Sequence, residues 1–207
     1  MSTVTVANLK GGTGKTTTAV HIAAGLANQS RGTTALVDAD AQGSALSWSE
    51  AAGGLGFSVL GLPTKDVHRR VKEELATFDN VVIDTPPGDA AVVRSALLAA
   101  DTIVFPISPG LLDIDRIRPT LELFAEVEPM NPAPVWALLT RVRTNTKSAR
   151  AARTVIEEDL GFTTFAVEIP LREHYAGAFG LPLEALGNYS TVVSELASGL
   201  KQEEVRS

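Results

Sequence analysis

The segment KGGTGKTT at positions 10–17 decides the fold, because it joins an apolar, β-rich run to a long helical pattern. Its glycines let the backbone curl tightly enough to turn N–H groups inward, and the following helix adds positive potential at its first turn. A loop of this kind holds the phosphates of a nucleotide. We expect Lys15 to reach the β- and γ-phosphates of ATP, and the Thr16 hydroxyl to ligate Mg²⁺. The residues expected to bind ATP here are Gly11, Gly12, Thr13, Gly14, Lys15, Thr16 and Thr17.

The loop departs from the common P-loop pattern in one place. The pattern G-x-x-x-x-G-K-[ST] requires a glycine at position 9, where this chain has Leu9, and an additional lysine, Lys10, follows it. The match is therefore to a deviant form of the motif. The alternative interpretation is a glycine-rich turn without a ligand, but the strand before it and the helix after it favour phosphate binding.

Outward from the loop, strand patterns alternate with helix patterns along the chain. This alternation predicts a parallel sheet with right-handed crossovers and helices on both faces. We therefore expect a single-domain α/β P-loop NTPase fold over residues 1–207, built on a doubly wound, mostly parallel sheet. Ligands in such folds bind beyond the carboxyl ends of the strands. The expected strands are 3–9, 34–38, 57–60, 80–84, 102–108 (interrupted by Pro106), 134–140 and 163–169, and the expected helices are 15–29, 41–52, 66–77, 90–100, 112–127 (with an awkward Pro119), 147–160 and 190–203.

Composition excludes several classes of protein. The 207 residues suffice for one domain with a sizeable core. The absence of cysteine rules out disulfides, iron–sulfur clusters and cysteine-based zinc sites, and it fits a cytoplasmic protein. A net charge of −6 disfavours nucleic acid overall, so that any DNA contact needs a local basic patch. No signal peptide or apolar run of membrane-spanning length is present, and we expect no membrane partner.

Three aspartates end apolar strands close to the loop. Asp38 and Asp40 lie in the segment 37–42, and Asp84 ends the run 81–84. A carboxylate in this position can hold Mg²⁺ or a water molecule. We expect Asp84 to support the metal in the manner of a Walker B residue, and Asp40 to lie near the γ-phosphate, where it orients the attacking water and adds to the metal site. The alternative is that these acids cap the helices that follow.

Together these residues resemble the ParA/MinD family of deviant Walker ATPases. The resemblance rests on positions 10–17, 38–42 and 84–88, and extends to 107–113 and 138–141. The short chain, which starts directly at the phosphate strand, looks most like the small ParA proteins of plasmid partition, the ParF-like subgroup. Larger relatives carry an N-terminal helix-turn-helix domain. We expect none here, and hence no operator binding.

The resemblance also implies a mechanism. In the family, two subunits sandwich two ATP molecules, and the signature lysine, here Lys10, reaches the partner's nucleotide. Lys10, Lys15 and Asp40 are therefore the expected catalytic residues. Family members bind DNA non-specifically when ATP-bound, which places them on the nucleoid, and a centromere-binding adaptor of the ParB or ParG type stimulates their slow hydrolysis. The adenine pocket of relatives corresponds here to Arg141 and Pro170.

A basic segment follows the sixth expected strand. No acid lies between Arg141 and Arg153, and three of its cations share helical spacing. Such a stripe can contact phosphates without reading sequence. The alternative is an ordinary solvated helix face, since acids occupy 157–159. The expected DNA-binding residues are Arg143, Lys147, Arg150 and Arg153.

The cargo stays open at this point. Our main interpretation is plasmid or chromosome partition. The alternative is a ParA-like ATPase that positions another cargo, such as a carboxysome or a chemotaxis array, because its core chemistry would be identical. A MinD-like membrane ATPase is less favoured, since the tail 200–207 mixes charges and lacks bulky apolar residues.

Overall fold

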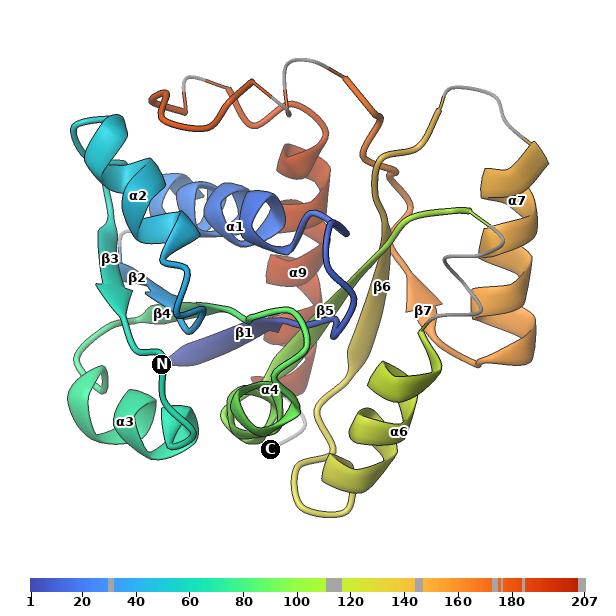
Figure 1. Ribbon diagram of the computed structural model, residues 1–207, viewed down its shortest axis with the longest axis horizontal. Helices are drawn as coiled ribbons and strands as arrows, with labels where there is room; N and C mark the ends of the chain where they lie inside the picture. Colours follow the sequence, from blue (N-terminus) through green and yellow to red (C-terminus); the bar gives the residue numbers. More distant parts are fainter. Residues whose placement is uncertain are drawn as a thin grey trace.

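The computed structural model describes residues 1–29, 32–110, 117–143, 147–172, 175, 177–183 and 185–204, with the backbone alone for 147 and 199–204. Seven strands form one sheet in the order β3-β2-β4-β1-β5-β6-β7, and every neighbouring pair is parallel (Figure 1). The expected α/β fold with a doubly wound parallel sheet is confirmed. The strands are β1 (Ser2–Val6), β2 (Thr34–Asp38), β3 (Ser58–Gly61), β4 (Asn80–Asp84), β5 (Thr102–Ile107), β6 (Val135–Leu139) and β7 (Thr163–Thr164).

Helices cover both faces of the sheet. Three of them pack with one apolar cluster, and the other helices pack with two clusters on the opposite face. The first face carries α1 (Lys15–Gln29), α2 (Ser44–Ala51) and α9 (Tyr189–Glu204), and the second carries α3 (Val67–Glu74), α4 (Ala90–Leu98), α6 (Arg118–Val127) and α7 (Lys147–Thr154), which continues into the π-helical turn η1 (Val155–Asp159). Among the described residues, no helix is long and apolar enough to cross a membrane.

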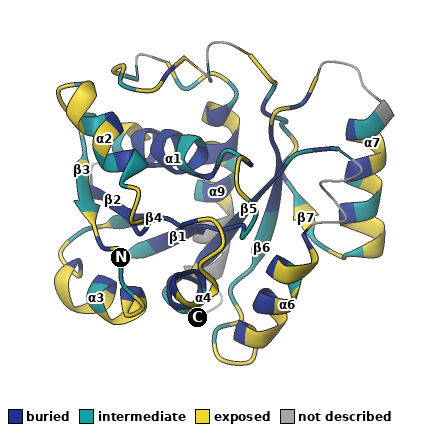
Figure 2. Cartoon of the chain, in the orientation of Figure 1, coloured by how far each residue is buried: buried dark blue, intermediate teal, exposed yellow. Residues whose placement is uncertain are grey.

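Burial on two faces explains why the strands are nearly continuous apolar runs. Val4 and Val6 of β1 pack under α1 and α9, whereas Ile103 and Phe105 of β5 pack under α4 and α6. Helix α1 is itself buried along most of its length between the sheet and α9, as Figure 2 shows by its dark colour. Parallel sheets need this double cover, because neither face can be left to water.

Two expected elements at the far edge of the sheet are wrong in extent. The strand predicted over 163–169 is reduced to β7, which pairs only with Trp136 and Ala137 of β6. The chain then leaves the sheet and returns at Ile169, whose N–H donates to Leu139 O at 2.9 Å. The helix predicted over 147–160 ends at Thr154 and widens into η1, where Leu160 N donates to Val155 O at 3.0 Å.

The two prolines that we expected to disturb elements do not. Pro106 lies inside a continuous β5, opposite Leu138. Ile103 N–H faces β6, so the alternating position of Pro106 faces β1. The pairing of β5 with β1 ends at Val104, two residues earlier, and the N–H that Pro106 lacks is therefore not needed there. Pro119 lies in the first turn of α6, where a missing N–H costs no hydrogen bond. Residues 112–116 of the expected helix lie outside the described part of the chain.

Candidate functional site

The phosphate loop leaves the carboxyl end of β1 at the centre of the sheet. Two of its glycines, Gly12 and Gly14, have φ values of 73° and 84°, which residues with a Cβ rarely adopt. Asn8 begins the loop: its Oδ1 accepts from Lys10 N at 2.9 Å, and its Nδ2 donates to Pro106 O at 2.9 Å. Asn8 is not among the residues expected at the site, although its position between the strand and the glycines is a signal.

Lys15 points into the loop. Its ammonium donates to Lys10 O at 2.9 Å, and the side chain is buried. Burial lowers the pKa of Lys15, while the charges of Asp84 and Asp40 act in the opposite direction and raise it. The three expected residues of the reaction centre are therefore close enough to interact. A buried ammonium held at the loop's mouth is suited to phosphate oxygens.

Asp84 meets the loop from β4. The register places it opposite Val6 at the end of β1 and opposite Asp38 at the end of β2. Its side chain is fully buried, and neither carboxylate oxygen forms a hydrogen bond of normal geometry with a described residue, although the Thr16 hydroxyl is close enough to act on its charge. Burial raises the pKa of Asp84 to about 7, against smaller lowering effects of the Thr16 hydroxyl and the Lys15 charge.

These unsatisfied oxygens fit a magnesium site. Buried polar atoms are normally paired, so two orphaned oxygens beside the Thr16 hydroxyl point to a missing ligand. No cluster of three or more acids or histidines converges within the described residues. That agrees with Mg²⁺ rather than opposing it, because Mg²⁺ in phosphate-transfer sites takes one or two carboxylates and completes its shell with water and substrate phosphate.

Asp38 and Asp40 separate into two roles. Asp38 is buried: its Oδ1 accepts from Asp40 N at 3.1 Å, and its Oδ2 accepts from Ala45 N at 2.8 Å and Leu46 N at 3.1 Å. It therefore caps the first turn of α2. Asp40 is half-exposed, and the hydrogen bond that its Oδ1 accepts among the described residues comes from Gln42 N, at 2.9 Å. The capping alternative applies to Asp38, and the carboxylate beside Lys15 is that of Asp40.

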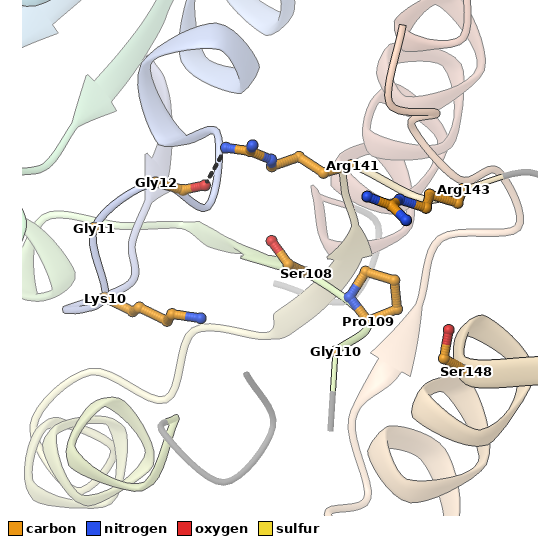
Figure 3. A pocket seen from close by; sticks show the side chains of 9 residues that line it. All are labelled: Lys10, Gly11, Gly12, Ser108, Pro109, Gly110, Arg141, Arg143 and Ser148. Atoms are coloured by element: carbon orange, nitrogen blue, oxygen red, sulfur yellow. Dashed lines mark hydrogen bonds between the residues drawn. The ribbon is translucent and has the colours of Figure 1, made fainter. Parts of the chain in front are cut away.

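The end of β6 ties down the phosphate loop. Thr140 Oγ1 donates to Thr13 O at 2.8 Å, and Arg141 Nη1 donates to Gly12 O at 3.0 Å (Figure 3). Arg141 has a φ of 56°, and no other non-glycine residue described has a positive φ. Strained backbone of this kind tends to occur at functional sites.

A small cavity beside Thr140 is the candidate adenine pocket. Its volume is about 150 Å³, and it contains both expected contacts, Arg141 and Pro170. Thr17, Leu171, Arg172, Tyr175 and Tyr189 line it as well. No sequence motif pointed to the two tyrosines, because they come from segments far along the chain that the fold brings to α1.

A larger cavity of about 470 Å³ lies along the outer side of the loop. Lys10, Arg141 and Arg143 all line it, as do Ser108 and Ser148 (Figure 3). The two lysines of the loop therefore lie in different places: Lys15 is enclosed by the loop, and Lys10 lines the outer cavity. Three cations around one opening make it suited to phosphate groups.

The expected DNA stripe is only partly assembled. Arg143 and Arg150 are exposed, and the side chain of Lys147 lies outside the described residues. Arg153 does not join them. Its guanidinium turns toward β7, where it donates to Phe165 O at 3.0 Å and to Thr164 Oγ1 and pairs with Glu157 and Glu168. Arg153 therefore ties α7 to the segment that begins at β7, and we leave it out of the proposed DNA surface.

The parallel sheet, the phosphate loop at the end of β1 and the buried Asp84 define a P-loop nucleotide-binding protein. A match to the CobQ/CobB/MinD/ParA nucleotide binding domain covers residues 4–183. Maintenance of carboxysome distribution protein A of Halothiobacillus neapolitanus is 34% identical over 181 residues, which span 85% of this chain and 82% of that protein. The protein of the same name from Gloeobacter kilaueensis is 39% identical over 164 residues, or 76% and 72% of the two chains.

The solved structures agree on the fold. An ATP complex of a McdA variant from Cyanothece superposes with a TM-score of 0.79 at 19% identity, covering 97% of this chain and 96% of that one. The chain belongs to the CobQ/CobB/MinD/ParA family and is a nucleotide-binding ATPase of that family.

Proposed function

We propose that this chain is a ParA-type ATPase that positions a cargo on DNA, and that its cargo is a carboxysome-like compartment. The observation that carries the ATPase assignment is the convergence of Lys15, Asp40 and the orphaned Asp84 carboxylate on one glycine-rich loop. Each group alone has a structural explanation. Together they supply a phosphate clamp, a metal ligand and a residue for the attacking water.

Each residue of the site has a role in hydrolysis. The N–H groups of residues 11–17 and the Lys15 ammonium hold the phosphates, and Thr17, Arg141 and Pro170 border the base. Asp84 and the Thr16 hydroxyl hold Mg²⁺, with Asp40 on the side of the γ-phosphate. Bound Mg²⁺ neutralises phosphate charge. Asp40 orients the attacking water, because its carboxylate is half-exposed and has one described hydrogen bond.

The cations of the outer cavity suggest how the protein assembles and binds DNA. Lys10 reaches the nucleotide of a second copy of this chain, and the ATP-bound dimer presents Arg143, Lys147 and Arg150 to the phosphates of DNA. An adaptor protein carried by the cargo stimulates hydrolysis and releases the dimer. The protein then works in the cytoplasm, on the nucleoid.

The relatives favour the cargo that we first held as the alternative. The two curated proteins above are carboxysome distribution proteins, with 34% and 39% identity over most of both chains. Plasmid partition, the main interpretation from sequence, has weaker support. The cargo adaptor would accordingly be a carboxysome-associated protein rather than a centromere-binding one.

Sedimentation with DNA tests the biochemical part. With ATP the protein should pellet with DNA of any sequence, and with ADP it should stay in the supernatant. Replacing Arg143 and Arg150 by alanine should weaken binding to all sequences alike and reduce the slope of log affinity against log salt by roughly one unit per lost contact. The control is Arg69→Ala and Lys72→Ala together, on exposed positions of α3. Equal losses in both double variants would refute the DNA surface.

A deletion in the host tests the cargo. In cells that lack this gene, fluorescently labelled carboxysome shells should cluster, while plasmids and chromosomes should still be inherited. The Lys15→Ala protein should fail to restore their spacing. Normal shell spacing together with loss of a plasmid would return the assignment to partition and leave the ATPase chemistry untouched.

A further inference from the structure

A second cavity, of about 430 Å³, lies at the other end of the molecule. Its lining includes Ile103, Val135 and Thr163, which stand at the amino-terminal ends of β5, β6 and β7. The phosphate loop lies at the carboxyl ends of the same parallel sheet. The groove, as we call this cavity, is thus separated from the nucleotide by the length of the strands, and ATP hydrolysis uses none of its residues.

The walls of the groove combine apolar side chains with the polar residues Glu128, Asn131 and Thr163, and they are partly open to water. Helix α6 contributes Leu121, Phe124 and Ala125, and Glu128, the residue that caps the end of the helix, continues the same face. Phe162 lies opposite, with its ring centroid 6.4 Å from that of Phe124 and nearly perpendicular to it. Ala125 is exposed, and Leu121 and Phe162 are half-buried. Accessible aromatic and aliphatic surface of this kind is a common site for an anchoring side chain.

Glu128 is the charged residue that lines the groove, and the chain segments from which the groove is built are acidic in sequence. Residues 119–140, which form most of it, contain no lysine or arginine, and neither do residues 154–171, of which 161–163 line it; Arg118, Arg153 and Arg172 flank these two segments. Three of their acids already have partners: Glu126 pairs with Arg94 of α4, and Glu157 and Glu168 pair with Arg153. The others are exposed and form no ion pair within the part of the chain that the structure describes: Glu122, Glu128, Glu158 and Asp159. Of these, Glu128 lines the groove itself.

We propose that the groove is a docking site for a basic segment of a partner protein, with a bulky apolar side chain between Phe124 and Phe162 and lysine or arginine near Glu128. The apolar anchor supplies affinity, and the acidic surface supplies selectivity and faster encounter. A purely apolar segment fits the apolar part of the groove but gains nothing from Glu128, and an acidic segment is repelled by Glu128. The nucleotide face carries the opposite charge, so one partner segment is not expected to fit both ends.

The test starts from peptides, because the groove specifies chemistry rather than a sequence. A random peptide library is selected on the full-length protein, once with ATP and once without nucleotide. The enriched peptides should combine lysine or arginine with a large apolar residue. The best peptide is then synthesised with a fluorophore, and its binding is measured by anisotropy against increasing salt, which should weaken it.

Two variants locate the binding. Ala125→Trp fills the opening from an exposed helix position and should weaken the peptide at least about tenfold, or 1.4 kcal/mol; Ala151→Trp, on the exposed side of α7, is the matched control. Glu128→Lys should weaken binding and flatten its salt dependence, whereas Glu50→Lys on α2 should not. Thermal melts and ATP titrations of all four variants should match those of the parent protein.

Several outcomes would overturn the proposal. These are enrichment of acidic peptides, the absence of any enriched peptide, and binding that Ala125→Trp leaves unchanged. If Ala125→Trp instead abolished a nucleotide-independent dimer, the occupant would be a second copy of the chain. None of these results depends on ATP turnover, so failure here is distinguishable from failure of the proposed ATPase, which the ATP titrations report.

Discussion

At the scale of single residues, the two aspartates at the end of β2, Asp38 and Asp40, show that a motif does not decide which acid caps a helix and which faces the nucleotide. Both follow the same apolar strand, and either could cap a helix or face a phosphate. In the structure Asp38 caps α2, because the helix begins only at Ser44, after Gly43 in a left-handed conformation with φ of 65°. Its carboxylate then reaches the N–H groups of Ala45 and Leu46. Asp40 stays beside Lys15.

This division predicts opposite phenotypes. Asp40→Ala should bind ATP normally but hydrolyse it far more slowly, because the water loses its orienting carboxylate. Asp38→Ala should lower the free energy of unfolding by roughly 1–2 kcal/mol through the lost cap, and retain most single-turnover activity per folded molecule. Urea denaturation and single-turnover hydrolysis on the same samples measure both quantities. A normal single-turnover rate in Asp40→Ala would assign the water to another residue.

Asp84 should make stability depend on pH in the nucleotide-free and magnesium-free protein. Its pKa is about 7 in the fold because of burial, against about 4 in an unfolded chain. A raised folded pKa means that the neutral form fits the fold, so the contribution of Asp84 to stability is full below pH 4. It is lost as pH rises toward 7, and then stays constant.

Comparison with Asp84→Asn isolates this effect. The free energy of unfolding is measured in urea with EDTA across this pH range. The parent should lose stability relative to Asp84→Asn as pH rises from about 4 to about 7, since asparagine does not ionise. Parallel curves for the two proteins would mean that Asp84 is ionised throughout and is balanced by a charge that we have not assigned.

At the scale of elements, the sequence predicted the bounds of a strand or helix correctly where the hydrophobic pattern alone determines which residues are buried. The strands 34–38 and 80–84 and the helix 15–29 agree with β2, β4 and α1 at both ends. The two strands are short apolar runs inside the sheet, and α1 is buried along most of its length. The strand predicted over 163–169 is wrong in extent: β7 is two residues long, although the other edge strand, β3, agrees with its prediction to within one residue, and no local signal marks where β6 stops pairing with β7.

At the candidate site too, the sequence predicted some features and not others. The loop, Asp40 and Asp84 could be placed from sequence because motif and strand ends both point to the carboxyl edge of the sheet. The direction of a long side chain could not. Arg153 shares helical spacing with Arg150, yet it turns toward Glu157 and Glu168, and the acid at 168 is remote in sequence. Tyr175 and Tyr189 reach the small cavity only through tertiary packing.

Helix α1 contains a glycine in its middle for a packing reason. A Cβ built on Gly25 would lie 2.4 Å from Val193 Cγ2 of α9. Alanine normally stabilises a helix interior by up to about 1 kcal/mol relative to glycine. Here we expect the reverse, because overpacking of a tight contact costs roughly 1–3 kcal/mol. The close approach of the two helices therefore requires the glycine.

A double-mutant cycle checks this contact. Gly25→Ala should lower the free energy of unfolding, and Val193→Ala should lower it by leaving a cavity. The combined variant should be more stable than the sum of the two changes predicts, since the new methyl fills the space that the valine leaves. Strict additivity in chemical denaturation would show that α1 and α9 adjust independently of this contact.

At the scale of the whole molecule, a net charge of −6 conceals two ends of opposite character. Lys10, Arg141 and Arg143 line one cavity at the carboxyl ends of the strands, while the charged residue that lines the groove at their amino ends is Glu128. A dimer formed through the nucleotide face would bring like charges together. Such an interface forms only if bound ATP supplies the compensating negative charge, which makes assembly dependent on the nucleotide.

The last prediction follows from that dependence. In ATP the protein should be a dimer, and in ADP or without nucleotide it should be a monomer, because the γ-phosphate adds the charge that Lys10 of the opposite copy binds. Lys10→Ala should keep much of the nucleotide affinity, since Lys15 remains, but stay monomeric in ATP. The experiment is light scattering in the Asp40→Ala background, where slow hydrolysis keeps ATP intact. Lys65→Ala, at an exposed position before α3, is the control and should dimerise. One unchanged mass in all three nucleotide states, or dimers of Lys10→Ala as stable as those of the control, would remove Lys10 from the interface and leave the outer cavity to DNA alone.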